Sequence, residues 1–307
     1  MITTIFSKSK PINFLIVFSI TLIACLLLPF KYPNVVVQEP VIWVLGGVFL
    51  IAFLSILVLD FIVSKNLLSQ QNNYEILLFA LFFLAIPQVF SDYKIMVSNF
   101  FILLALRRLI SVRSKKEVIK KLFDTGLLIG IATLFYFWAI VFFPLIFIAL
   151  LLFSETTVKH YLVPFIGLAA VAVLAICYSI IFYDDYFLAL HINPAVNFDF
   201  SNYNSLQFIT VITMLLSFGI WSSLFYLKDI RKKMRSFRPS YKLLFFSCMF
   251  AAAITVFAPQ KNGSEFLFLF APLAVIITNY IDTIEEKWFK EVFLGLLIII
   301  PVVLLVL

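Results

Sequence analysis

Apolar runs of near membrane-spanning length follow one another along the whole chain, and they constrain its fold more than any other feature. Crossing about 30 Å of hydrocarbon takes roughly 20 helical residues at about 1.5 Å each. Apolar residue types make up 64% of the 307 residues, and only 13% are charged. Soluble domains are about half apolar and about a quarter charged. The sequence therefore predicts an all-α integral membrane protein.

Eleven segments fit this pattern, and several of them are short or interrupted. They are 12–30, 41–63, 75–90, 95–110, 122–137, 138–154, 162–183, 206–227, 242–258, 266–281 and 292–307. The longest polar interval between them, 184–204, is too short to bury a core of its own. We therefore expect about eleven transmembrane helices in a single polytopic membrane domain, residues 1–307.

The direction of the later helices depends on whether 122–154 crosses the membrane once or twice. Lys and Arg concentrate on the cytoplasmic side of membrane proteins. With a cytoplasmic amino terminus and two crossings, both strongly basic blocks (107–121 and 228–242) lie inside, with all but three of the 23 Lys and Arg residues. One crossing would place the second block outside. We therefore predict two crossings, and with them a periplasmic carboxyl terminus.

Two full spans need more residues than this stretch contains, because 33 positions give fewer than about 17 each. These helices must be short, tilted or incompletely spanning. Gly126, Gly130 and Pro144 are suited to close packing or to a helix break. The neighbouring stretch 75–110 is similarly interrupted by Pro87 and by SDYK. Two adjacent short hairpins predict an indented fold with a cleft.

The net charge of +7 comes from short Lys and Arg blocks between apolar runs, a pattern that sets membrane topology and argues against nucleic-acid binding. Topology alone explains these blocks. As an alternative, four of their residues are candidates for contacting lipid phosphate or a partner: Arg107, Arg108, Lys232 and Lys233.

Acidic residues mark the predicted outer face. The segment DDYFLALHINPAVNFDFSNYN (184–204) is the richest in polar groups, and clustered carboxylates near a histidine can move a proton or bind a cation. The simpler interpretation is a solvated loop whose acids cap helix ends. The catalytic candidates are Glu39, Asp92, Asp184 and Asp185, and the ligand-binding candidates are His191, Asp199 and Glu265. We find no metal-binding spacing.

Few polar groups interrupt the apolar segments. Asp60 and Asp124 are functional candidates by default, since ionisable residues are costly in a membrane. Both lie near the predicted cytoplasmic interface, which favours a structural role. Asn99 is expected to make an interhelical hydrogen bond.

Three segments resemble the GT-C glycosyltransferases, which use polyprenyl-phosphate sugars. The first is LFDTGLLIGIATLFYF followed by WAIVFFPLIFIALLLF, the second LVPFIGLAAVAVL and the third GSEFLFLFAPLAVIITNYI, which together cover roughly 122–281. The resemblance implies a GT-C-like core, a polyprenyl-phosphate-linked saccharide and a catalytic acid in the first external loop. That loop is only KYPNVVVQEPV here, with Glu39 as its sole acid.

The whole chain, beginning FSKSKPINF, also resembles an uncharacterised multi-pass family of Bacteroidota. This resemblance implies a bacterial inner membrane, with an outer membrane beyond it.

Whether the chain is an enzyme is open at this point. The short first loop favours a non-catalytic component of envelope biogenesis that binds a lipid-linked saccharide or docks other envelope membrane proteins. The alternative is a GT-C-like membrane glycosyltransferase, and only that alternative calls for a cofactor, a divalent cation. A secondary transporter is the third hypothesis, disfavoured because no carboxylate lies at mid-membrane and no internal repeat is evident.

Overall fold

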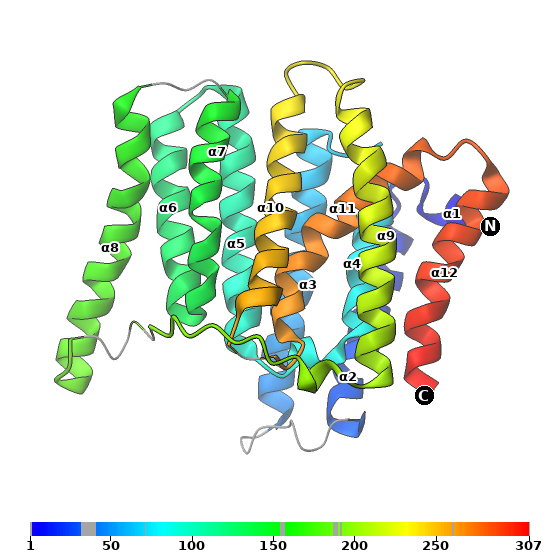
Figure 1. Ribbon diagram of the computed structural model, residues 1–307, viewed down its shortest axis with the longest axis horizontal. Coiled ribbons are helices and arrows are strands. Elements are labelled where there is room, and N and C mark those ends of the chain that lie inside the picture. The colour runs from blue at the N-terminus through cyan, green and yellow to red at the C-terminus, as the bar shows by residue number, and fades with distance from the viewer. Residues whose placement is uncertain are drawn as a thin grey trace. The chain divides into compact units, whose positions relative to one another are not determined.

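The computed structural model describes residues 2–31, 41–70, 72–153, 157–186, 190, 192–259 and 261–306, and its regular elements are all helices within these ranges (Figure 1). The α-helices are α1 (Ile2–Phe6), α2 (Pro11–Lys31), α3 (Val41–Asn66), α4 (Tyr74–Ala85), α5 (Tyr93–Ser111), α6 (Val118–Phe135), α7 (Pro144–Phe153), α8 (Val158–Tyr183), α9 (Leu206–Ile230), α10 (Arg238–Phe257), α11 (Leu267–Thr283) and α12 (Lys287–Val306). Short 3-10 helices include η2 (Pro87–Phe90), η3 (Val112–Ser114), η4 (Phe137–Phe142), η6 (Ser201–Tyr203) and η7 (Ser264–Phe266).

Each of the eleven predicted segments coincides with a helix or helix pair, and the predicted all-α fold is confirmed. Among the described residues, eight helices are long and apolar enough to cross a membrane. The other three predicted segments are α4, α6 and the η4–α7 stretch, which are shorter or carry more charge. The count of eleven crossings therefore stays a prediction, as does the sidedness of the chain.

The chain forms two compact units, which are described separately. Unit 1 contains Met1–Met96, Asp199–Lys232 and Gln260–Leu307. Its centre is a pair of buried helices, α4 and α11, and all 12 residues of α4 are buried. Helices that are apolar on every side bury themselves in this way. Helices α2, α3 and α12 pack against α4, and α9 packs against α11.

Helices α4 and α11 run in opposite directions, as the contacts at their ends show. Asn279, near the end of α11, donates a hydrogen bond of 2.7 Å from Nδ2 to the carbonyl oxygen of Leu68, just ahead of α4. At the other end, Gly263 precedes α11 and lies beside Ile86, which follows α4. Two glutamates occupy these opposite ends, Glu75 in the first turn of α4 and Glu265 in η7.

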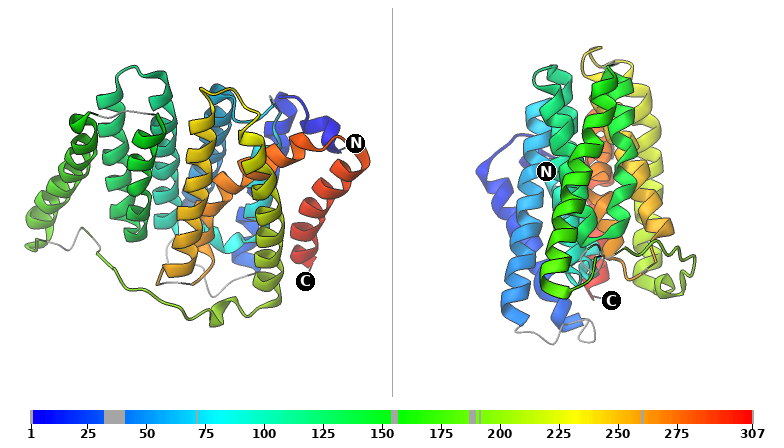
Figure 2. Two further views of the ribbon diagram at one scale, coloured as in Figure 1. Left: turned by 45° about the horizontal axis from the view of Figure 1, so that its top comes forward. Right: turned by 90° about the vertical axis from the view of Figure 1, so that its left-hand side faces the viewer.

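Unit 2 contains Val97–Phe198 and Lys233–Pro259. Within it, the stretch 122–153 forms two helical segments that lie side by side, α6 and η4–α7 (Figures 1 and 2). The chain turns at Tyr136, whose backbone is extended, with φ −146° and ψ 109°. Pro144 then begins α7, a position where its missing N–H costs no helical hydrogen bond.

The length of α6 is greater than the apolar run suggested. The helix begins at Val118, so it includes Lys120 and Lys121 from the basic block, and its 18 residues extend about 27 Å. Lysine side chains can keep their ammonium groups hydrated at a helix end, and their aliphatic stems do not interrupt the helix. Because α6 begins four residues before the apolar run 122–154, it is longer than half of that run and closer to the length of a full span.

Two glycines allow α6 and α8 to approach closely. A Cβ on Gly126 would lie 2.9 Å from the carbonyl carbon of Pro164, and a Cβ on Gly167 would lie 2.5 Å from the carbonyl oxygen of Phe123. Close contact through small residues is a common way to pack helices in membranes. The expected packing role of Gly126 is therefore confirmed, and the contact fixes the positions of side chains one turn away on both helices.

Candidate functional site

The predicted outer acids differ in their surroundings. Glu39 and His191 lie outside the described residues. Asp184 and Asp185 are exposed just beyond the last residue of α8, and Asp184 has a left-handed backbone, φ 52°. They belong to unit 2, whereas Asp92, Asp199 and Glu265 belong to unit 1.

Two of these carboxylates bind the backbone at the start of helical segments. Asp92 accepts hydrogen bonds from the N–H groups of Lys94 at 2.9 Å and Ile95 at 3.3 Å, in the first turn of α5. Asp199 accepts one from the N–H of Ser201 at 2.9 Å, which lowers the pKa of its carboxyl group. The contact of Asp199 matches the capping role that was the simpler interpretation of the acids in 184–204, and Asp92 makes contacts of the same kind.

Glu265 is fully buried and stabilises a tight turn. Its Oε2 accepts a hydrogen bond from the N–H of Gly263 at 3.0 Å, whereas Oε1 has no partner among the described residues. Gly263 has φ 94°, a conformation that favours glycine, and a Cβ there would lie 2.7 Å from the ring of Phe208. The turn thus supplies a hydrogen bond to one carboxylate oxygen of Glu265, and the other oxygen is buried without one among the described residues.

The predicted basic residues also separate into different environments. Lys232 forms an ion pair with Asp229 at 2.7 Å, which raises the pKa of the lysine. The ammonium of Lys233 lies 5.2 Å from the centre of the Tyr241 ring. Arg107 is half-buried. Arg108 lines a cavity.

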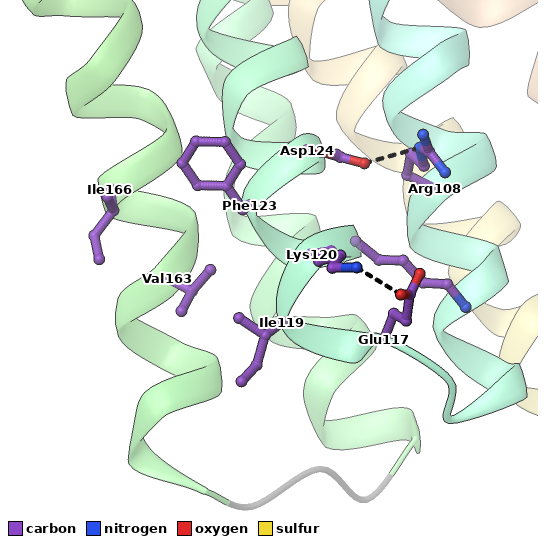
Figure 3. A pocket seen from close by; sticks show the side chains of 9 residues that line it. Arg108, Glu117, Ile119, Lys120, Phe123, Asp124, Val163 and Ile166 are labelled. Atoms are coloured by element: carbon purple, nitrogen blue, oxygen red, sulfur yellow. Dashed lines mark hydrogen bonds and ion pairs between the residues drawn. The ribbon is translucent and has the colours of Figure 1, made fainter.

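That cavity, here called the α6 pocket, has a volume of about 500 Å3 and lies in unit 2 beside the first turns of α6 (Figure 3). Apolar side chains from α6 and α8 form one side, and charged side chains from α5, α6 and the preceding turn form the other. The lining residues are Arg108, Glu117, Ile119, Lys120, Lys121, Phe123, Asp124, Val163 and Ile166.

The charged side of the α6 pocket contains three basic and two acidic groups. Nε of Arg108 lies 3.1 Å from Oδ2 of Asp124, and Nζ of Lys120 lies 2.6 Å from Oε1 of Glu117. The second contact raises the pKa of Lys120 and lowers that of Glu117, so both stay ionised at neutral pH. Lys121 donates from Nζ to the carbonyl oxygen of Ser111 at 2.6 Å. The pocket therefore has one excess positive charge.

The apolar side of the α6 pocket depends on the glycine contact between α6 and α8. Phe123 offers its carbonyl oxygen to the close approach of Gly167, and its side chain faces the pocket. Val163 precedes Pro164, the residue that touches Gly126. The packing of the two helices therefore sets the width of the apolar wall.

A cavity with these two sides fits an amphiphile. Arginine and lysine bind phosphate through charge-assisted hydrogen bonds, and Arg108 carries further N–H donors beyond the Nε that contacts Asp124. Hydrocarbon can lie against Phe123 and Ile166. No group of three or more His, Cys, Asp or Glu side chains that could hold a metal occurs among the described residues.

A second cavity, here called the α4 pocket, lies in unit 1 and has a volume of about 490 Å3. It contains Asp60 and a buried carboxylate that the sequence interpretation missed, Glu75. Glu75 begins an apolar segment, a position that normally indicates a hydrated helix end, so burial was not evident. The signal in the sequence was the polar cluster QNNYE at 71–75.

Asp124 and Asn99, two polar residues within the apolar segments, have different surroundings. Asp124 takes the structural role that was favoured, as the partner of Arg108. Asn99 is buried, but its Nδ2 has no hydrogen-bond partner among the described residues. Its neighbour Ser98 instead makes an interhelical bond, from Oγ to the carbonyl oxygen of Ala132 at 2.9 Å.

These features are those of a helical protein with several helices long and apolar enough to span a membrane, and with charged pockets near helix ends. The chain belongs to a family of unknown function (DUF6427), whose model matches residues 1–307. No curated protein and no solved structure matches the chain.

Proposed function

We propose that this protein is a non-catalytic component of cell-envelope biogenesis that binds the phosphate of a lipid-linked saccharide in the α6 pocket. The observation that carries the proposal is the two-sided lining of that pocket, basic on one side and apolar on the other. A lipid phosphate has the same two parts, an anionic group and a hydrocarbon chain.

The charged groups suit an anionic phosphate better than a neutral sugar. The guanidinium of Arg108 offers a planar set of donors, and Lys120 and Lys121 supply mobile point charges. A phosphate oxygen can approach Lys120 by displacing Glu117, because this ion pair is exposed to solvent and contributes little. The lipid chain then lies along Phe123 and Ile166.

The proposed position is the cytoplasmic leaflet of a bacterial inner membrane. The α6 pocket includes residues of the basic block 107–121, and this block is predicted to face the cytoplasm. A lipid-linked saccharide is assembled from soluble precursors, so its phosphate is first present in that leaflet. The role would be to hold or hand on the lipid for other envelope proteins.

The non-catalytic part of the proposal is supported by the surroundings of the acids. Asp92 and Asp199 accept backbone hydrogen bonds, and these contacts account for both residues without a reaction. The glycosyltransferase alternative would need such an acid to face an acceptor hydroxyl instead.

A binding measurement tests the proposal directly. The purified chain in detergent is titrated with a polyprenyl phosphate and with the matching polyprenol, which lacks the phosphate. The double variant Lys120→Gln/Lys121→Gln should bind the phosphate at least tenfold more weakly, about 1.4 kcal/mol. The alcohol should bind poorly to both proteins.

The matched control is Lys115→Gln/Lys116→Gln. It removes the same charge from the same basic block, but neither residue lines the α6 pocket. The affinity of this control variant for polyprenyl phosphate should stay within about twofold of that of the unmodified protein, as expected for surface charges screened at physiological salt. Equal losses in both double variants, or equal binding of phosphate and alcohol, would refute a phosphate site in this pocket.

A further inference from the structure

The α4 pocket of unit 1 carries an inference that does not rest on the proposed function. It lies where the end of α3, the start of α4 and the turn after α1 come together. Asp60 and Ser64 contribute from α3, Asn73 and Glu75 from the start of α4, and Lys8 from the turn. The pocket is therefore polar, although it adjoins a helix long and apolar enough to span a membrane.

Two of its side chains are buried and have polar atoms without a hydrogen-bond partner among the described residues. Glu75 is 1% exposed, and its Oε2 makes no hydrogen bond within the described residues. Asn73 is 0% exposed, and neither its Oδ1 nor its Nδ2 has a partner there. Leaving such groups unsatisfied costs about 1–3 kcal/mol each. Both residues line the cavity, so these atoms lie next to the space that a bound molecule would fill.

The surrounding contacts hold these groups in place. Asn72 donates from Nδ2 to Oδ1 of Asp282 at 2.7 Å, and the N–H of Asn73 donates to the carbonyl oxygen of Phe6 at 3.0 Å. The segment ahead of α4 is thereby tied both to α11 and to α1. A side chain on a fixed backbone is pre-organised for a ligand, which lowers the entropy lost on binding.

The size of the α4 pocket argues for a molecule larger than an ion. Its volume of about 490 Å3 lies in the usual range of small-molecule sites, roughly 300–1,000 Å3. A bare cation would leave most of this space to water. It would also leave Nδ2 of Asn73 without an acceptor.

The polar groups specify the chemistry of the molecule. Glu75 and Asp60 are acceptors that favour a cation with N–H donors, such as a primary ammonium. Nδ2 of Asn73 and the ammonium of Lys8 are donors that favour an oxyanion. We propose that the α4 pocket binds a phosphoethanolamine group, with its ammonium against Glu75 and Asp60 and its phosphate toward Asn73 and Lys8. The group can come from a free ester or from a phosphatidylethanolamine headgroup.

The test compares two matched ligands on the full chain. Phosphoethanolamine and phosphocholine share the phosphate, but the trimethylated nitrogen of phosphocholine has no N–H donor. Isothermal titration in detergent should show binding of phosphoethanolamine at least tenfold tighter than that of phosphocholine. Phosphatidylethanolamine and phosphatidylcholine in nanodiscs, followed by native mass spectrometry, form the lipid arm.

The variant Glu75→Gln keeps the shape of the side chain and removes its ionisable carboxyl group. It should weaken phosphoethanolamine binding at least tenfold, whereas Glu286→Gln, an exposed acid outside the pocket, should change it less than twofold. Thermal unfolding of both variants verifies that each is folded.

The two arms distinguish the sources. Binding of the soluble ester assigns a free ligand, and retention of phosphatidylethanolamine alone assigns a lipid headgroup. Equal binding of the ethanolamine and choline compounds in both arms would overturn the proposal, as would equal behaviour of the two variants or binding of neither ligand.

Discussion

At the residue scale, acids of the same type take different roles because their neighbours differ. The carboxylate of Asp92 accepts hydrogen bonds from two backbone N–H groups of α5. Glu75 lines a cavity, and one of its carboxylate oxygens is buried without a partner among the described residues. The first arrangement stabilises a helix end, and the second is the one for which we propose a ligand. The sequence showed both acids near helix starts, so their positions along the chain did not distinguish them.

The capping role of Asp92 predicts a particular pair of results. Asp92→Ala should lower the free energy of unfolding by about 1 kcal/mol, since alanine cannot accept the N–H groups of Lys94 and Ile95. Asp92→Asn should keep most of the stability, because asparagine is also a good cap. Thermal unfolding in detergent measures both.

The same pair separates capping from catalysis. If Asp92 acted as a base, Asp92→Asn would abolish the cellular function while the protein stayed folded. A complementation assay with that variant should instead give normal growth.

At the scale of elements, the contact between α6 and α8 controls the α6 pocket. A Cβ at Gly126 would overlap the backbone of Pro164, which cannot move aside as a side chain can. Gly126→Ala should therefore push the helices apart and cost about 1–3 kcal/mol of stability. It should also weaken binding of polyprenyl phosphate, because Phe123 and Val163 then separate.

Gly46→Ala is the control for this prediction. Gly46 is also in a helix, α3, but nothing lies within 4 Å of the position of its added Cβ. Alanine should be neutral or stabilising there by up to about 1 kcal/mol. Thermal unfolding measures the stability of both variants, and titration measures their affinity for polyprenyl phosphate. Equal effects of Gly126→Ala and Gly46→Ala would show that the α6–α8 contact does not control the α6 pocket.

Helix positions were predictable from the apolar runs, whereas the sites were not. The apolar run 122–154 predicted two helices that meet between residues 137 and 138, and the chain turns close by, at Tyr136. This was predictable because a long apolar stretch enters lipid only as a helix. The start of α6 was missed, since lysines at an interface do not mark a helix boundary. The α6 and α4 pockets depend on side chains far apart in sequence, such as Arg108 and Val163, and a single sequence does not reveal such contacts.

At the scale of the whole molecule, the distribution of positive charge predicts its orientation. The two blocks 107–121 and 228–242 should lie on one side of the membrane, because each contains seven Lys or Arg residues and such clusters resist translocation. Reporters fused after Lys115 and after Arg235 should both indicate the cytoplasm. A reporter after Asn193 should indicate the opposite side. If the reporters after Lys115 and Arg235 lay on opposite sides of the membrane, the predicted orientation, and with it the cytoplasmic location of the α6 pocket, would be refuted.

The most direct test of the account asks which molecule occupies the α6 pocket in cells. A photo-crosslinking amino acid replaces Phe123, on the apolar wall of the pocket, or Phe165, which is 49% exposed on α8 and does not line it. After illumination, mass spectrometry identifies the attached lipid. We predict a phosphate-bearing polyprenyl lipid enriched at 123 over 165, and the same neutral lipids at both positions would contradict the account.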